Sequence, residues 1–157
     1  MSDWWSPLIS SVAGLAGVTI GAWLTGRREK WERKRQIYAD VLKALSDSFV
    51  GAQTVAEVCR LTQSPSSAAY DKQVLDELYK EKLEQAVKAQ QAASQTIAIA
   101  QILLPTDAVE VLHRFDTDWA AASGDIGEVA AKRVKICERA KNDLVPIARR
   151  DLGSWIG

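Results

Sequence analysis

Apolar residues recur every three or four positions through most of the chain, which is the spacing of amphipathic helices. The clearest stripe lies within residues 27–62, which we expect to form one helix. A break follows at "TQSPSS", residues 62–67, where Pro65 stands among small polar residues. The stripe consists of Tyr38, Val41, Leu42, Leu45, Phe49, Ala52, Val55, Ala56 and Cys59.

Three further helices are predicted after this break. A long one covers residues 67–104, and a short one with Thr106 as its N-cap runs to about residue 122. The last covers about residues 125–152, and Pro146 is expected to kink or restart it. The expected buried residues of the two longer helices are Val74, Leu75, Leu78, Leu83, Ala86, Val87, Ala93, Ile97 and Leu104, and then Ile126, Val129, Cys137, Ala140, Leu144 and Ile147.

The start of the chain has the character of a membrane anchor. Residues 4–26 are 23 consecutive residues without a charge, and a bilayer-spanning helix needs about 20. A cleaved signal peptide would carry positive charge before its apolar core, whereas only Asp3 precedes this run. We therefore predict a single-pass anchor, with a buried core helix or an interfacial helix as alternatives. Indole rings favour membrane–water interfaces, and the expected interface residues are Trp4, Trp5, Trp23 and Trp31.

One side of this run carries small residues at intervals of three or four. "GVTIG", residues 17–21, matches G-x-x-x-G, a pattern that lets helix backbones approach closely in lipid. We expect this side to pack against a second copy or another membrane helix. Its residues are Ser10, Gly14, Gly17, Gly21 and Thr25.

Residues 27–36, called the basic collar from here on, hold six Lys or Arg and two Glu, a net charge of +4 (6 − 2). No helix breaker separates the collar from the run before it, so one continuous helix is expected. The positive-inside rule places the N-terminus outside and residues 37–157 in the cytoplasm. Basic residues beside a bilayer attract anionic lipids, and the expected contacts are Arg27, Arg28, Lys30, Arg33, Lys34 and Arg35.

The fold class that follows is all-α. An N-terminal transmembrane helix (residues 1–26) continues through the basic collar (27–36) into a cytoplasmic helical domain (37–157). That domain is a long-helix antiparallel hairpin or a three- to four-helix bundle, coiled-coil-like in its long arms. Whether the long helices pair within one chain or between chains stays open at this stage.

Charge argues against nucleic acid as the main partner. The whole chain has a formal net charge of zero, and residues 37–157 hold 14 basic and 17 acidic residues, a net of −3. The basic footprint is confined to the collar, which lipid and topology already explain. A soluble bundle that binds nucleic acid through its basic helix is therefore ranked third, after the two membrane-bound functions given below.

Catalytic and metal-binding patterns are missing. Glu110 and His113 match the Glu-x-x-His pattern of di-iron bundles, but His113 is the only histidine, so the second pair cannot form. Cys59 and Cys137 lie on apolar stripes, which predicts two small buried thiols and no Cys–His nucleophile. Walker, G-x-G-x-x-G and G-x-S-x-G motifs are absent from the sequence. We expect no enzyme, no cofactor, no metal and no small-molecule substrate.

Several short motifs resemble those of small bacterial and bacteriophage-encoded single-pass membrane proteins of uncharacterised function. They are the small-residue membrane helix, "RREKWER" at residues 27–33, Tyr38 in a long helix, "ILLP" at 102–105 and "ARRDLG" at 148–153. The resemblance covers most of the chain. It implies a protein of the bacterial inner (plasma) membrane, of prophage or accessory type, and it supplies no active site.

The function favoured by these observations is that of a non-enzymatic, membrane-anchored interaction or scaffold protein. Its partners would be anionic lipids and a second copy or another membrane protein. The alternative is a bilayer-perturbing or pore-forming oligomer built through the small-residue side. Trp155 and Ile156 at the end of the chain would fold back on the bundle, touch the membrane or meet a partner.

Overall fold

The structure is a computed structural model that describes the backbone of residues 5–63 and 72–153, and the side chains of 25–63 and 73–153. These ranges contain four helices and no strand. The prediction of an all-α protein is therefore confirmed. The helices are α1 (Trp5–Gln63), α2 (Lys72–Leu103), α3 (Thr106–Ala121) and α4 (Ile126–Gly153).

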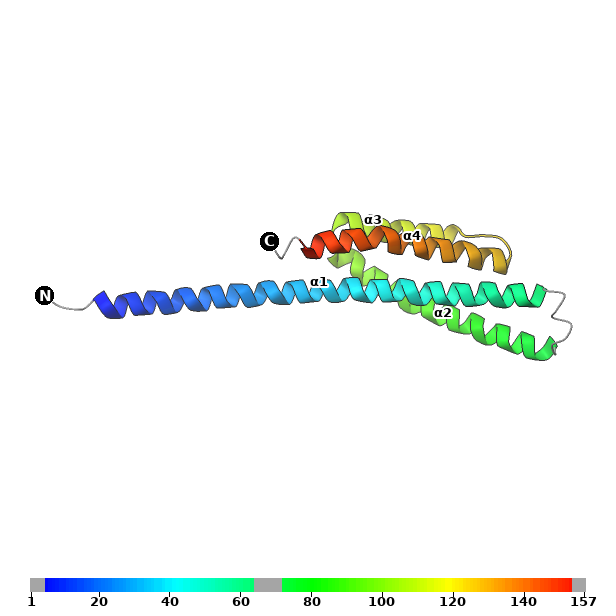
Figure 1. Cartoon of the computed structure of the whole chain (residues 1–157), viewed down its shortest axis with the longest axis horizontal. Coiled ribbons are helices and arrows are strands. Elements are labelled where there is room, and N and C mark those ends of the chain that lie inside the picture. Colours follow the sequence, from blue (N-terminus) through cyan, green and yellow to red (C-terminus); the bar gives the residue numbers. More distant parts are fainter. Residues whose placement is uncertain (1–4, 64–71, 154–157) are drawn as a thin grey trace.

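Helix α1 is the axis of the molecule. It is one helix of 59 residues, unbroken where the uncharged run meets the basic collar. Figure 1 shows α2 running back along the C-terminal part of α1, while α4 returns on the other side toward the collar. The N-terminal part of α1 continues beyond the other three helices. The long helices thus pair within a single chain.

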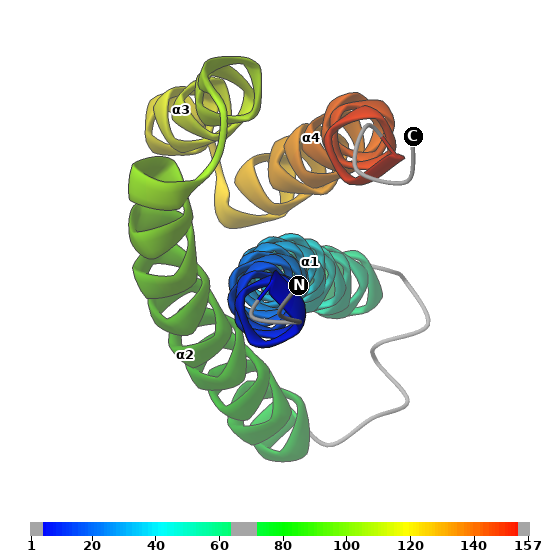
Figure 2. The ribbon, with the colours of Figure 1, turned by 90° about the vertical axis from the view of Figure 1, so that its left-hand side faces the viewer.

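Viewed from the end, α1 lies between α2 and α4, and α3 lies beside α4 (Figure 2). Helix α1 packs against both α2 and α4, and α3 packs mainly against α4. This placement explains the wide apolar stripe of α1, because a helix with neighbours on two sides must bury more of its circumference.

The main core lies toward the collar end of the bundle, where α1, the end of α2, α3 and the end of α4 meet. Its largest fully buried side chains include Tyr38, Leu45, Ile97, Phe115 and Leu144. A smaller cluster at the other end joins Val55, Cys59 and Ala130. The rest of the main core is formed by Val41, Ala100, Leu104, Ala108, Val111, Leu112, Cys137, Ala140 and Ala148.

Four residues that we predicted to be buried are exposed, so these predictions are wrong. Val74, Leu78 and Val87 of α2 are 59%, 37% and 49% exposed, and Ile126 of α4 is 52% exposed. Helix α2 packs mainly against α1 (Figures 1 and 2), and only some of its side chains, such as Leu83 and Ala86, also reach the cluster around Ala130 of α4. A helix with one neighbour buries only a narrow stripe, and apolar residues outside that stripe face solvent.

The helix ends differ in detail from the sequence prediction. Thr106 is the first residue of α3 and not its cap: Pro105 occupies the cap position without a side-chain hydrogen bond. Helix α4 does have a side-chain cap, because Asp125 Oδ1 accepts a hydrogen bond from Glu128 N at 2.8 Å. Of the two outcomes expected at Pro146, a kink or a restart, the restart is wrong, because α4 continues through Pro146 as one helix.

The close approach of α1 and α2 depends on a glycine. A Cβ atom added at Gly51 would lie 3.3 Å from both Cα and Cβ of Ala86 on α2. Such a distance is tighter than ordinary van der Waals contact, so a larger side chain would push the two helices apart. Gly51 and Ala86 thus set the spacing of this helix pair.

In the ranges with described side chains, no helix is long and apolar enough to cross a membrane. The anchor prediction rests chiefly on residues 4–24, whose side chains lie outside those ranges. It therefore stays a prediction.

Candidate functional site: the collar end of the bundle

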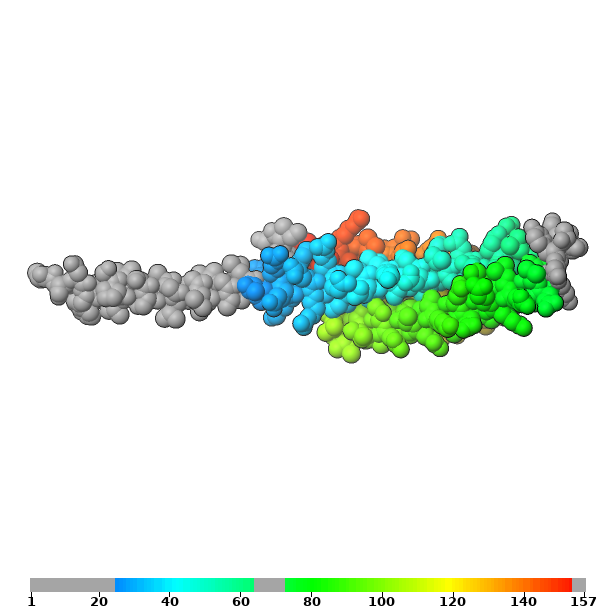
Figure 3. Space-filling model, turned by 90° about the horizontal axis from the view of Figure 1, so that it is seen from below, coloured from blue at the N-terminus to red at the C-terminus, as the bar shows by residue number. Residues whose placement is uncertain are grey.

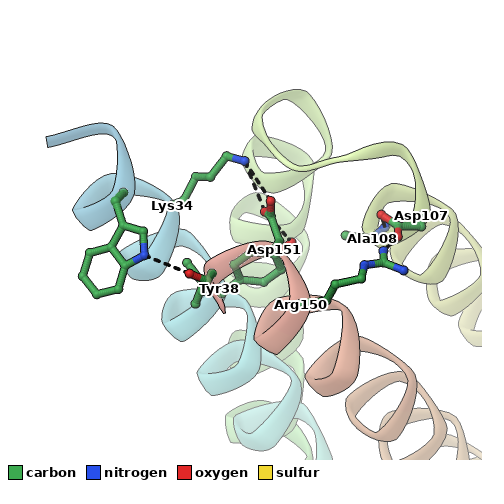
Figure 4. Close-up of polar contacts among 8 residues, drawn as sticks. Lys34, Tyr38, Asp107, Ala108, Arg150 and Asp151 are labelled. Atoms are coloured by element: carbon green, nitrogen blue, oxygen red, sulfur yellow. Dashed lines mark hydrogen bonds and ion pairs between the residues drawn. The ribbon is translucent and has the colours of Figure 1, made fainter. Parts of the chain in front are cut away.

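The end of α4 meets α1 at the basic collar through a partly buried polar cluster. Asp151 of α4 accepts hydrogen bonds from Lys34 Nζ at 3.1 and 3.2 Å and from the Tyr38 hydroxyl at 3.1 Å. Figure 4 shows Lys34 and Tyr38 of α1 pointing toward this carboxylate. One carboxylate thus links two consecutive turns of α1 to the last turn of α4.

The cluster is largely shielded from solvent. Tyr38 is 2% exposed, and the side chains of Lys34 and Asp151 are 31% and 16% exposed. Burial, reinforced by the neighbouring Asp151 carboxylate, raises the pKa of the Tyr38 hydroxyl far above its ordinary range. Tyr38 therefore remains a neutral donor to Asp151 at every physiological pH.

Trp31 adds a second contact between the same two helices. Its indole Nε1 donates to the carbonyl oxygen of Leu152 at 3.3 Å, and the Arg35 guanidinium carbon lies 5.6 Å from its ring centroid. The carbonyl of Leu152 lies in the last turn of α4, where helix carbonyls lack intrahelical partners. The Trp31 N–H, which we expected at a membrane interface, is thus engaged within the chain.

An ion pair connects α4 to α3 at this end. Arg150 contacts the carboxylate of Asp107, which stands in the first turn of α3 and also accepts from Ala108 N at 3.0 Å (Figure 4). A carboxylate in a first turn also complements the helix dipole. Three of the four helices are therefore joined by polar contacts where α1 enters the bundle. We call this set of contacts the collar clamp: Trp31, Lys34, Tyr38, Asp107, Arg150, Asp151 and the Leu152 carbonyl.

The remaining collar cations lie on the surface. Arg28 forms an exposed ion pair with Glu32 at 2.9 Å, in the i,i+4 arrangement of a solvated helix face. Of the six predicted lipid contacts, Lys34 is thus drawn into the clamp. The exposed members are Arg27, Arg28, Lys30, Arg33 and Arg35.

Other predicted interface residues can be placed only in part. Thr25 is exposed on α1 just before the collar. The remaining interface tryptophans and small residues lie outside the described side chains: Trp4, Trp5, Trp23, Ser10, Gly14, Gly17 and Gly21. Trp155 and Ile156 also lie outside the described residues.

The clamp residues of α4 could not be found from the sequence pattern. The sequence held one signal, because Tyr38 falls in the apolar stripe and a buried hydroxyl needs a partner. The identity of that partner was hidden, since Asp151 is 113 residues away along the chain.

Among the described residues, the candidate metal ligands and thiols do not come together in one site. Glu110 and His113 are exposed, and no three His, Cys, Asp or Glu side chains among the described residues come together as metal ligands. Cys59 and Cys137 are free and buried. Burial raises the pKa of both thiols, to about 12 for Cys137, which keeps them protonated at neutral pH.

Comparison with known proteins adds no further constraint. No protein-family model, no curated protein and no solved structure matches the chain. The function is therefore inferred from the residues and geometry described above.

Proposed function

We propose that this protein is a non-enzymatic, membrane-tethered interaction protein whose helical bundle is held against the cytoplasmic face of the bacterial inner membrane. The observation that carries the proposal is that one unbroken helix, α1, contains both residues 5–26 of the uncharged run and the axis of the bundle. Five collar cations are exposed between the two. Basic side chains at that position match the attraction of anionic lipid headgroups, about 1 kcal/mol for each near the surface.

The collar clamp gives this arrangement its stiffness. Lys34, Tyr38 and Trp31 hold the last turn of α4 to α1 at the point where α1 leaves the bundle. Without such contacts the bundle would be connected to the collar by a single helix alone. With them, the orientation of the bundle relative to the collar is fixed by two helices.

Self-association is the interaction that the surface favours. Near the collar end of the bundle, α2 exposes Ile99, Ile102 and Leu103, which are 59%, 82% and 47% exposed. Figure 3 shows α1 and α2 side by side on the face seen there, with the end of α2 lying toward the collar. Copies confined to one membrane share depth and orientation, so weak apolar contacts gain a high effective concentration. The small-residue side of the run at residues 10–25 would bring the α1 helices of two copies together.

The tether is tested by fractionation. Membranes from cells expressing the full chain are washed with alkaline carbonate, and the same is done for a chain lacking residues 1–26. We expect the full chain to stay in the pellet and the shortened chain to appear in the supernatant as a helical protein. Release of the full chain by carbonate would contradict the tether.

Self-association is tested by cysteine crosslinking. In membranes, Ile102→Cys should give crosslinked dimers with a short bifunctional maleimide, whereas the native thiols are buried and should not react. Val50→Cys on α1 is the matched control, because Val50 is 58% exposed but lies away from the end of α2. Equal dimer yields from the two variants would contradict a specific interface at the end of α2.

A pore-forming oligomer is the second candidate, and the G-x-x-x-G match at residues 17–21 is what favours it. In that case, Gly17→Leu and Gly21→Leu should abolish both the oligomer and any leak of a dye from vesicles. If the two variants lose the oligomer but the wild-type protein causes no dye leak, the pore-forming function is excluded and the scaffold function remains.

A further inference from the structure

A cavity of about 190 Å³ lies in the bundle away from the collar clamp, and all four helices contribute to its lining. Its walls are mostly apolar, and Val87 and Ile126 at its edge are about half exposed, which gives it access to solvent. Pockets that bind small molecules combine apolar walls with a few convergent polar groups. The apolar lining comes from Ala52, Val55, Leu83, Ala86, Val87, Trp119, Ile126, Val129 and Ala130.

Four polar side chains line this cavity, and three of them, each from a different helix, have a buried polar atom without a hydrogen-bond partner. They are Ser48 Oγ of α1, Gln90 Oε1 of α2 and Arg133 Nε of α4. Ser48 is only 3% exposed. Buried polar groups in folded proteins are almost always paired, so three unpaired groups around one cavity point to a missing hydrogen-bonding occupant.

The charge of the occupant follows from Arg133. Its guanidinium carbon lies 4.6 Å from the ring centroid of Trp119, and burial lowers its pKa, although a guanidinium stays protonated in proteins. Over the described ranges, no carboxylate forms an ion pair with it. A cation held in this way is a ready partner for a carboxylate, and hydrogen bonds to charged groups are among the strongest.

We propose that this cavity binds a small monocarboxylate with an apolar body about the size of one aromatic ring. One carboxylate oxygen would accept from Arg133 Nε–H and the other from the Ser48 hydroxyl. The Gln90 NH₂ group, which donates to Ser94 Oγ at 3.4 Å, would turn from that hydrogen bond to donate to the same headgroup. The body would lie against Trp119 and the aliphatic walls. A cavity of about 150 Å³ holds one benzene molecule, so the size fits a benzoate-like ligand.

The first test needs only the wild-type protein. Full-length protein in a non-ionic detergent is titrated against 4-fluorobenzoate, with binding followed by ¹⁹F line broadening. The neutral isostere 4-fluorobenzamide is titrated in parallel. We expect the carboxylate to bind about tenfold or more tightly than the amide, since a charge-assisted hydrogen bond is lost. No binding of the carboxylate, as for a cavity that holds water alone, would overturn the proposal, and so would equal affinity for the two probes.

Variants then locate the site. Arg133→Gln should weaken 4-fluorobenzoate binding about tenfold and leave 4-fluorobenzamide binding unchanged. Arg139→Gln is the matched control, because Arg139 lies on the same helix but pairs with Asp118 on the surface. Val87→Trp should block the exposed edge and weaken both probes without removing any charge. If Arg133→Gln and Arg139→Gln have the same effect on carboxylate binding, the site lies elsewhere and the proposal fails. Should Arg133→Gln not fold, unchanged affinity in Val87→Trp would equally overturn the proposal.

Discussion

The collar clamp makes a quantitative prediction about the contact between Tyr38 and Asp151. The proposed changes are Tyr38→Phe, Asp151→Ala and the two together, studied as a double-mutant cycle. Each single change removes one partner of a hydrogen bond that joins α1 to α4 at 3.1 Å. The cycle isolates the free energy of this contact from the other effects of each change.

The magnitudes follow from burial. Asp151→Ala leaves the Tyr38 hydroxyl without its acceptor. Because the Tyr38 side chain is only 2% exposed, this loss should lower the free energy of unfolding by about 1–3 kcal/mol. It also removes the Lys34 ion pair, worth about 0.5–1 kcal/mol at its partial exposure. Tyr38→Phe keeps the buried ring and should cost about 1 kcal/mol. The double variant has no hydroxyl to leave unpaired. Its loss of unfolding free energy should therefore be about 1–2 kcal/mol smaller than the sum of the losses in the two single variants.

The assay is unfolding of the full-length protein in detergent micelles, followed by circular dichroism at neutral pH. Asp118→Ala serves as the control, since its ion pair with Arg139 is exposed and should contribute about 0–1 kcal/mol. Additive losses for Tyr38→Phe and Asp151→Ala, within about 0.3 kcal/mol, would show that the two side chains do not interact in solution. In that case the clamp would not fix the end of α4.

Three further predictions concern the bundle itself. Gly51→Val should destabilise the protein by about 1–3 kcal/mol in the same unfolding assay, because the larger side chain forces α1 away from α2. Gly26→Ala is the control: a Cβ atom added at Gly26 meets nothing within 4 Å, so this change should be neutral or stabilising. Asp125→Ala should cost about 1 kcal/mol through the lost cap of α4, and Asp125→Ser should restore most of it. Because the pKa of Cys137 is raised from 9.0 to about 12, the unfolded chain loses this proton first, so stability falls as pH rises through that range. Cys137→Ala should therefore show a shallower decline of unfolding free energy above pH 9.0 than the wild type, and an unchanged slope would contradict this.

The helices themselves could be predicted because their information is local. The three-to-four spacing around Leu45 defines α1, and Pro65 and Pro105 mark breaks near the two ends of α2. Which residues of α2 are buried could not be predicted equally well. Burial there depends on how many neighbours the helix has, and α2 packs mainly against α1 (Figure 2). Apolar residues such as Val74 therefore carry the pattern of a buried stripe without being buried.

The clamp shows a second limit. Lys34 belongs to a run of six cations, and nothing in that run distinguishes it from its neighbours. Its position on α1 relative to Tyr38, one turn away, decides that it faces Asp151, and only the packing of α4 reveals this. The pattern of a basic segment beside an apolar run thus gives no sign that Lys34, within that segment, holds the bundle together.

The polar residues of the cavity are visible in the sequence, but they lie on three different helices, far apart along the chain. Ser48 lies three residues after Leu45 and four before Ala52, in the register of buried positions on α1. Arg133 has the same spacing from Ala130 and Cys137 on α4, and Gln90 has the reverse spacing, four residues after Ala86 and three before Ala93 on α2. A single polar residue in an apolar stripe has many explanations. Three such residues, brought by the fold to one cavity and each with one unpaired buried atom, share a single explanation, because a bundle that needed only packing would place apolar side chains at all three positions.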